Sequence, residues 1–154
     1  GIPVNNCSDP RHGIDASAEF SVGAGGGTSQ WPENIGLAAT FDPELVKEFG
    51  EMASKEYRAL GLTTSLSPQC DLATEPRWFR FPGTFGEDAK LSSDLTRAYC
   101  DGFQTSEGEA EIEDGWGRDS VNTMVKHWPG GGCGEGGRCA FWMWKIFRFS
   151  GWQF

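Results

Sequence analysis

Two amphipathic helices with N-terminal caps alternate with three short β-favouring runs, and this order constrains the fold more than any other feature of the sequence. The first helix is predicted to begin after Asp42, with Pro43 at its first position, and to end at Gly61. The second is predicted from Asp88 to Phe103. The β-favouring runs occupy residues 2–7, 62–66 and 120–125. Strands separated by such helices form parallel βαβ units, so the sequence predicts an α/β fold.

The apolar residues of each predicted helix recur at helical spacing, which indicates the surface expected to be buried. Residues three or four apart lie on one side of a helix, and such a stripe packs against a sheet or another helix. The stripe of the first helix comprises Leu45, Phe49, Met52, Ala53 and Leu60. The stripe of the second comprises Leu91, Leu95, Ala98 and Tyr99.

The chain is acidic, and its charge argues against two classes of partner. With 13 basic and 22 acidic residues among 154, the net charge is −9, so the field around the protein repels nucleic acid and anionic lipid. No run approaches the roughly 18 consecutive apolar residues of a membrane-spanning helix, and residues 1–4 lack the features of a signal peptide. We therefore expect one globular domain with no nucleic-acid partner and no membrane partner.

The five cysteines form no recognisable metal or disulfide pattern. They are widely spaced and contain no C-x-x-C pair, and neither histidine, His12 or His127, completes a zinc set with Cys133 and Cys139. We expect free thiols, no metal site and no cofactor. A thiol-dependent redox or metal protein remains an alternative that rests only on Cys133 and Cys139.

Polar residues follow each predicted strand. The carboxyl ends of parallel strands meet on one rim of the sheet, where ligands of α/β proteins bind. The residues expected there are Asp9 and His12 after the first strand, residues 71–80 after the second, and Lys126 and His127 after the third. Three strands cannot close a barrel, because a (β/α)8 barrel needs eight strands and typically about 250 residues.

Four motifs on these loops resemble the N-terminal barrel of glycoside hydrolase family 3, the β-glucosidase group, and the resemblance covers roughly residues 1–140. In chain order they are GIPV with SDPRHG (1–4 and 8–13), WPENIGLAATFDP (31–43), EPRWFR (75–80) and VKHWPG (125–130). The resemblance implies that residues 1–140 are an incomplete piece of a (β/α)8 TIM-type barrel. It also implies that the chain is a fragment of a retaining β-glycosidase that hydrolyses β-glucosides.

The resemblance carries four sugar-binding residues onto this chain. Asp9 matches an aspartate that accepts hydrogen bonds from sugar hydroxyls, Arg80 matches an arginine that donates to the same ring, and Lys126 and His127 match a Lys-His pair. Charged donors and acceptors of this kind orient a ring of hydroxyls through charge-assisted bonds. Without the family pattern, Asp9 would be a turn cap, Arg80 a surface ion pair and His127 a core histidine.

The chain also departs from the family's pattern. It has Trp78-Phe79-Arg80 where many members have Trp-Gly-Arg, and Gly83-Thr84 replaces a common Glu-Ser, which weakens the match at Arg80. The family's retaining mechanism needs two carboxylates about 5 Å apart. No acidic residue of this chain matches either one, so we predict no catalytic residue and no activity for the chain alone. The alternative from another class is a small non-catalytic carbohydrate-binding or scaffolding module.

Residues 141–154 form an atypical tail. The segment FWMWKIFRF has no helical or strand periodicity. Advancing the reading frame by one base through Trp142-Met143-Trp144 forces Gly-Cys-Gly, and permissible codons continue into a sequence like that of the family. One hypothesis is a frameshifted gene fragment, and the other is a real terminal segment packed on a sheet edge. Because three strands leave sheet edges unpaired, we also expect self-association.

Overall fold

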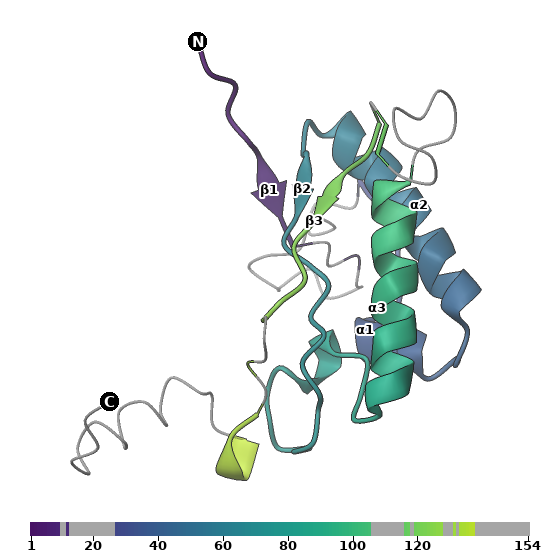
Figure 1. Cartoon of the computed structure of the whole chain (residues 1–154), viewed down its shortest axis with the longest axis vertical. Helices are drawn as coiled ribbons and strands as arrows, with labels where there is room; N and C mark the ends of the chain where they lie inside the picture. The colour runs from purple at the N-terminus through teal and green to yellow at the C-terminus, as the bar shows by residue number, and fades with distance from the viewer. Residues whose placement is uncertain are drawn as a thin grey trace, which may run out of the picture.

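The computed structural model describes residues 1–9, 12, 27–105, 116–117, 119–127, 131 and 133–137. Its sheet has three parallel strands, β1 (Cys7–Ser8), β2 (Thr64–Ser65) and β3 (Asn122–Thr123), in the order β1-β2-β3 (Figure 1). Ser8 pairs with Ser65, which pairs with Thr123. The parallel βαβ arrangement predicted from the sequence is therefore present. The tail at 141–154 lies outside the described residues, so neither hypothesis about it is tested.

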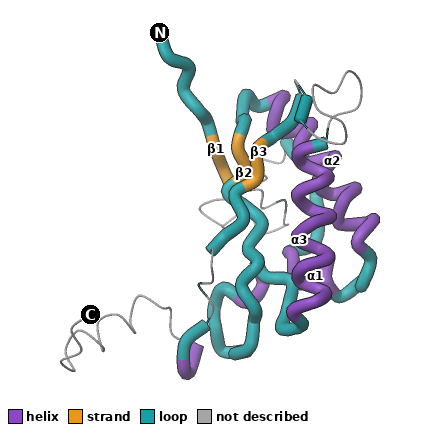
Figure 2. Tube along the Cα trace, viewed as in Figure 1, coloured by secondary structure: helices purple, strands orange, loops and turns teal. Residues whose placement is uncertain are grey.

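In the described residues, three α-helices accompany the sheet. They are α1 (Asn34–Ala38), α2 (Pro43–Ala59) and α3 (Ala89–Gln104). Helices α2 and α3 pack against each other, and both lie on the same side of the three strands (Figure 2). The sequence predicted α2 and α3 but not α1. Within the described residues, no helix has both the length and the apolar character needed to cross a membrane.

Both long helices begin at the caps that the sequence predicts. The Asp42 carboxylate accepts hydrogen bonds from the Glu44 and Leu45 amides at 3.0 and 3.3 Å, and Asp88 accepts one from the Leu91 amide at 2.7 Å. These bonds satisfy backbone donors that have no partner within the first turn. Beyond the other end of α2, Gly61 has a φ of +74°, a conformation that glycine adopts without the strain a side chain would add.

The buried face of α2 differs from the predicted stripe. Met52 and Leu60 are 41% and 58% exposed, so their predicted burial is wrong. Packing against α3 and the sheet selects a face rotated toward smaller and aromatic residues, because α3 approaches too closely for a row of large aliphatic side chains. The buried residues of α2 are Val46, Phe49, Gly50, Ala53, Ser54 and Tyr57.

The first predicted strand is mostly outside the sheet. Strand pairing begins only at Cys7, and Ile2 and Val4 are 97% and 82% exposed. Figure 1 shows this amino-terminal stretch extending away from the other strands. The prediction of a buried strand over residues 2–7 is therefore wrong except at its end. The residues are β-favouring, but their side chains are exposed, and of these Asn5 accepts hydrogen bonds from the Thr63 and Thr64 hydroxyls.

The crossing of α2 and α3 depends on two glycines. A Cβ on Gly102 would meet the carbonyl oxygen of Lys47 at less than contact distance and would stand 2.9 Å from the Cα of Gly50. A Cβ on Gly50 would stand 2.9 Å from the carbonyl oxygen of Tyr99. The obstacles are backbone atoms, which cannot move aside as a flexible side chain can. The two helices therefore pack with their backbones in contact.

We expect Gly102→Ala to lower the free energy of unfolding by about 1–2 kcal/mol. Overpacking costs about 1–3 kcal/mol, whereas alanine in a helix interior gains roughly 0.5–1 kcal/mol over glycine, so the steric cost outweighs the gain. Urea denaturation of the two proteins measures the difference. Gly27→Ala is the matched control, since nothing lies within 4 Å of a Cβ there. Equal stability of the Gly102 variant and the parent would contradict the close crossing.

Candidate functional site

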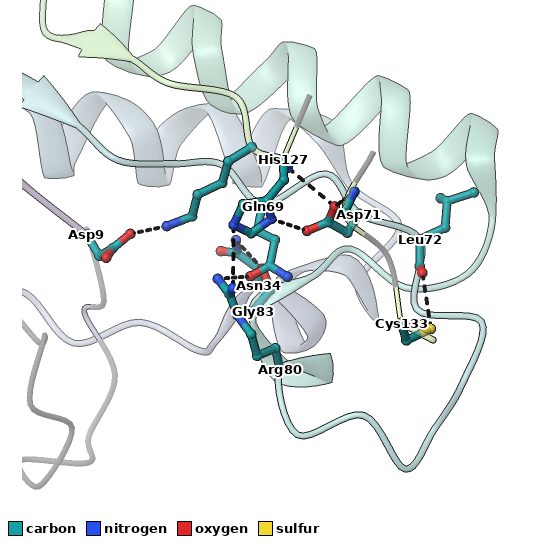
Figure 3. A network of polar contacts seen from close by, with 11 residues as sticks. Asp9, Asn34, Gln69, Asp71, Leu72, Arg80, Gly83, His127 and Cys133 are labelled. Atoms are coloured by element: carbon teal, nitrogen blue, oxygen red, sulfur yellow. Dashed lines mark hydrogen bonds and ion pairs between the residues drawn. The ribbon is translucent and has the colours of Figure 1, made fainter. Parts of the chain in front are cut away.

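The predicted site residues meet where the three strands end. The segments that follow β2 and β3 remain paired, as the parallel bridge between Gln69 and Lys126 shows. The Cys70 amide donates to the Lys126 carbonyl at 2.8 Å, and the Lys126 amide donates to the Pro68 carbonyl at 2.9 Å. Asp9 directly follows β1. The pairing thus places residues from three distant parts of the sequence at one edge of the sheet, as Figure 3 shows.

Asp9 and Lys126 form an ion pair within this cluster. The Lys126 Nζ donates to Asp9 Oδ1 at 2.5 Å. The Lys126 side chain is 17% exposed and the Asp9 side chain is 26% exposed. Partial burial strengthens the attraction relative to a surface pair, yet both groups keep access to solvent. The pair therefore presents a fixed acceptor and a fixed donor at the end of the sheet.

His127 is oriented by a buried carboxylate. Its Nδ1 lies 2.8 Å from Asp71 Oδ2, and the Asp71 side chain is fully buried. Because an ionised carboxylate only accepts hydrogen bonds, Nδ1 carries the proton and Nε2 of the neutral ring is an acceptor. The His127 side chain is 42% exposed. His127 is thus a held, accessible imidazole rather than a core histidine.

Asp71 remains ionised despite its burial. Burial alone would raise the pKa of this carboxyl, but the hydrogen bond from the His127 ring outweighs that effect together with bonds from two backbone amides. The amides are those of Gly131, at 2.8 Å, and His127, at 3.3 Å. The net result is a pKa below the ordinary value for aspartate. Asp71 therefore acts as a charged anchor for His127.

Arg80 reaches the same cluster from the neighbouring loop. Its Nη2 donates to Gln69 Oε1 at 3.1 Å, and its Nη1 lies 3.5 Å from His127 Nε2 (Figure 3). The loop is held to α1, because Asn34 Nδ2 donates to the Gly83 carbonyl at 3.1 Å. The unusual Phe79 beside it is 75% exposed. The altered motif therefore still brings the arginine to His127.

We expect Asp71→Asn to destabilise the protein by about 2 kcal/mol at neutral pH, because the His127 ring and two backbone amides lose the charged acceptor that they share. Folding lowers the pKa of Asp71, so its carboxylate contributes stability above its unfolded pKa of about 3.9 and loses that contribution as the pH falls through the folded value. Urea denaturation between pH 7 and pH 2 should show a shallower acid loss for the variant. Parallel pH profiles for variant and parent would contradict this role of Asp71.

Other candidate residues lie away from this cluster. His12 is buried and bonds to Glu56 of α2, with its Nε2 2.8 Å from Oε2. Trp31 packs against the core, and Trp78 is buried. Cys133 Sγ lies 3.3 Å from Thr74 Oγ1.

The cysteines of the described residues are all free. They are Cys7, Cys70, Cys100 and Cys133. No group of three or more potential metal ligands occurs in the part of the chain that the structure describes. Cys139, on which the redox or metal alternative partly rests, lies outside that part.

Two further residues build this site: Asp71, which the sequence placed at this rim within residues 71–80 without giving it a role, and Gln69, which the sequence did not single out. Gln69 and Asp71 are each 4% exposed and alternate along the segment that continues β2. Two residues apart in an extended chain, they point to the same side, where one holds Arg80 and the other holds His127. The sequence signal that could have identified both residues was their position, two residues apart, just after the strand predicted at residues 62–66.

The fold and the site define a parallel α/β domain with a polar cluster at the carboxyl ends of its strands, the arrangement of (β/α)8 barrel proteins. The family described as Glycosyl hydrolase family 3 N terminal domain matches residues 2–139. The chain therefore belongs to glycosyl hydrolase family 3. Its resemblance to that family and its fold class, an incomplete piece of a (β/α)8 barrel, are confirmed.

Two curated relatives are similar over most of the chain. The β-glucosidase C of Emericella nidulans is 49% identical over 140 residues, which cover 89% of this chain and 21% of the relative. The periplasmic β-glucosidase/β-xylosidase of Dickeya chrysanthemi is 45% identical over 137 residues, which cover 89% and 20%. This chain thus spans about a fifth of the length of these relatives.

Solved structures of related proteins share the fold. A β-glucosidase from Erythrobacter marinus is 31% identical with a TM-score of 0.72, over 90% of this chain and 16% of that one. A β-glucosidase from Listeria innocua is 29% identical with a TM-score of 0.64, over 83% and 15%.

Proposed function

We propose that this chain forms part of the sugar-binding subsite of a retaining β-glycosidase of the β-glucosidase type. One observation carries the proposal: Asp9, Arg80, Lys126 and His127 converge at the carboxyl ends of three parallel strands. Residues 1–140 are, in this proposal, part of the N-terminal barrel domain, and residues 141–154 are a separate tail. The nucleophile and the acid/base come from parts of the protein outside these 154 residues.

The cluster has the chemistry that a pyranose requires. Each sugar hydroxyl both donates and accepts, so recognition needs acceptors and donors placed side by side. The Asp9 carboxylate accepts, while the Lys126 ammonium and the Arg80 guanidinium donate. Nε2 of His127 accepts, since Asp71 holds the proton on Nδ1. A sugar would exchange hydrogen bonds with these groups as it displaces water from them.

The relatives support this substrate class. The β-glucosidase of Listeria innocua has been solved with glucose and with isofagomine, and a D270A mutant of it has been solved with laminaribiose. The curated relatives are named as β-glucosidases and a β-glucosidase/β-xylosidase. We therefore propose glucosides as the first substrates to examine.

A segment-exchange enzyme tests the proposal. Residues 2–139 of this chain would replace the matching segment in the β-glucosidase C of Emericella nidulans. We expect this enzyme to bind glucose, followed by tryptophan fluorescence, and to hydrolyse an aryl β-glucoside. Glucose binding without hydrolysis by a folded enzyme would favour the non-catalytic carbohydrate-binding module. Loss of both, in an enzyme with an unchanged circular dichroism spectrum, would contradict a sugar subsite.

A further inference from the structure

A second polar cluster, outside the candidate site, joins α2 to His12 and Ser29. Its centre is Glu56, whose Oε2 lies 2.8 Å from His12 Nε2. The same carboxylate accepts from the Ser29 amide at 2.6 Å, through Oε1, and from the Ser29 hydroxyl at 3.1 Å, through Oε2. One side chain therefore ties together two points of the chain, residues 12 and 29, that lie 17 residues apart in the sequence.

The histidine in this cluster is rigidly placed. Its side chain is fully buried, its ring meets Phe49 edge-on at 5.5 Å, and it stacks near Tyr57 at 6.4 Å between ring centroids. Its carbonyl accepts from the Trp31 amide at 2.8 Å. Because the ring and the backbone are both held, His12 is a fixed point three residues beyond Asp9.

The other side of Asp9 is fixed by the next residue of the same helix. The hydroxyl of Tyr57, which is fully buried, donates to the Ser8 carbonyl at 3.0 Å. That carbonyl also accepts from the Leu66 amide at 2.9 Å. The peptide that leads into Asp9 is thus held by both the sheet and α2. The following Pro10 further restricts the backbone of Asp9, since the residue before a proline loses much of its conformational range.

We propose that Glu56 is a positioning residue for Asp9, with Tyr57 assisting it from the other side. The two helical residues fix the backbone before and after Asp9, so the carboxylate meets Lys126, and a sugar hydroxyl, in one orientation. This inference rests on the proposed function, because it concerns the role of Asp9 in that subsite. Neither Glu56 nor Tyr57 needs to touch the sugar for this role.

Glucose binding by variants of the segment-exchange enzyme tests the proposal. Glu56→Ala releases the backbone beyond Asp9 and so weakens the hydrogen bond of Asp9 to the sugar, and we expect it to raise the Kd for glucose about tenfold, roughly the effect of losing one hydrogen bond to a charged group. The Kd of Glu56→Gln should lie within about threefold of the parent value. The side-chain oxygen of the glutamine still accepts from the Ser29 backbone amide, and its NH2 group can donate to His12 in the other tautomer. Glu48→Ala, an exposed site on the same helix, should leave the Kd unchanged.

The Asp9→Asn background separates positioning from general damage to the fold. If Glu56 acts through Asp9, Glu56→Ala changes the Kd less than about twofold when Asp9 is already Asn, since coupled residues are not additive. Tyr57→Phe, which keeps the ring, should behave in the same way with a smaller change. A tenfold effect of Glu56→Ala that persists in the Asp9→Asn background would overturn the proposal, as would no effect in the parent. If Asp9→Asn itself leaves glucose binding unchanged, the proposed sugar subsite fails as well.

Discussion

Replacing Lys126 by alanine in the segment-exchange enzyme is expected to lower kcat/KM for an aryl β-glucoside by about 30- to 1000-fold. A charge-assisted hydrogen bond that strengthens toward the oxocarbenium-like transition state contributes on the order of 2–4 kcal/mol, which corresponds to that range. Removing Lys126 also leaves the Asp9 carboxylate, which is only 26% exposed, without its cation. The loss should therefore appear in kcat as well as in KM.

Lys90→Ala is the control for this experiment. Lys90 also forms an ion pair, with Asp94 at 2.6 Å, but its side chain is 83% exposed on α3. Such pairs contribute little to stability, so its removal should change kcat/KM less than about twofold. A change below about threefold for Lys126→Ala would contradict the assignment of Lys126 to the sugar subsite.

The 154-residue chain alone should not hydrolyse aryl β-glucosides above the buffer rate. Retaining hydrolysis needs a nucleophilic carboxylate and a protonated acid about 5 Å apart. The two site carboxylates have other tasks: Asp9 pairs with Lys126, and Asp71 is buried against His127 with a lowered pKa that makes it a poor acid. General acid catalysis alone contributes roughly 10²–10⁴-fold, so losing it together with the nucleophile removes most of the rate enhancement.

This measurement needs a high protein concentration and the segment-exchange enzyme as a positive control. Release of the aryl alcohol is followed over hours, with Lys126→Ala in the 154-residue chain as a second blank. A turnover of about 1 s⁻¹ or faster that disappears in the Lys126 variant would show that the chain contains its own catalytic pair.

The sequence predicted the helices of this fold better than the strands. Caps at Asp42 and Asp88 act locally, so the positions of α2 and α3 follow from a few neighbouring residues. Which side of α2 is buried depends on the approach of α3 at Gly50 and Gly102, which no local pattern reveals. Strand pairing is also a tertiary property, and for that reason the β-favouring run at residues 2–7 joins the sheet only at its end.

The candidate site, like the fold, could be predicted from the sequence only in part. The motifs identified Asp9, Arg80, Lys126 and His127, and the structure places these residues at one edge of the sheet. The residues that hold Arg80 and His127 are Gln69 and Asp71, and neither belongs to one of these motifs.

A structure of the segment-exchange enzyme with bound glucose tests whether a sugar binds at the carboxyl ends of the three strands. We predict that the Asp9 carboxylate and the Lys126 ammonium each lie within about 3.2 Å of a glucose hydroxyl, and that His127 and Arg80 border the same ring. Glucose bound at another site, with the Asp9–Lys126 pair unchanged and not in contact with it, would contradict a sugar subsite at these strand ends.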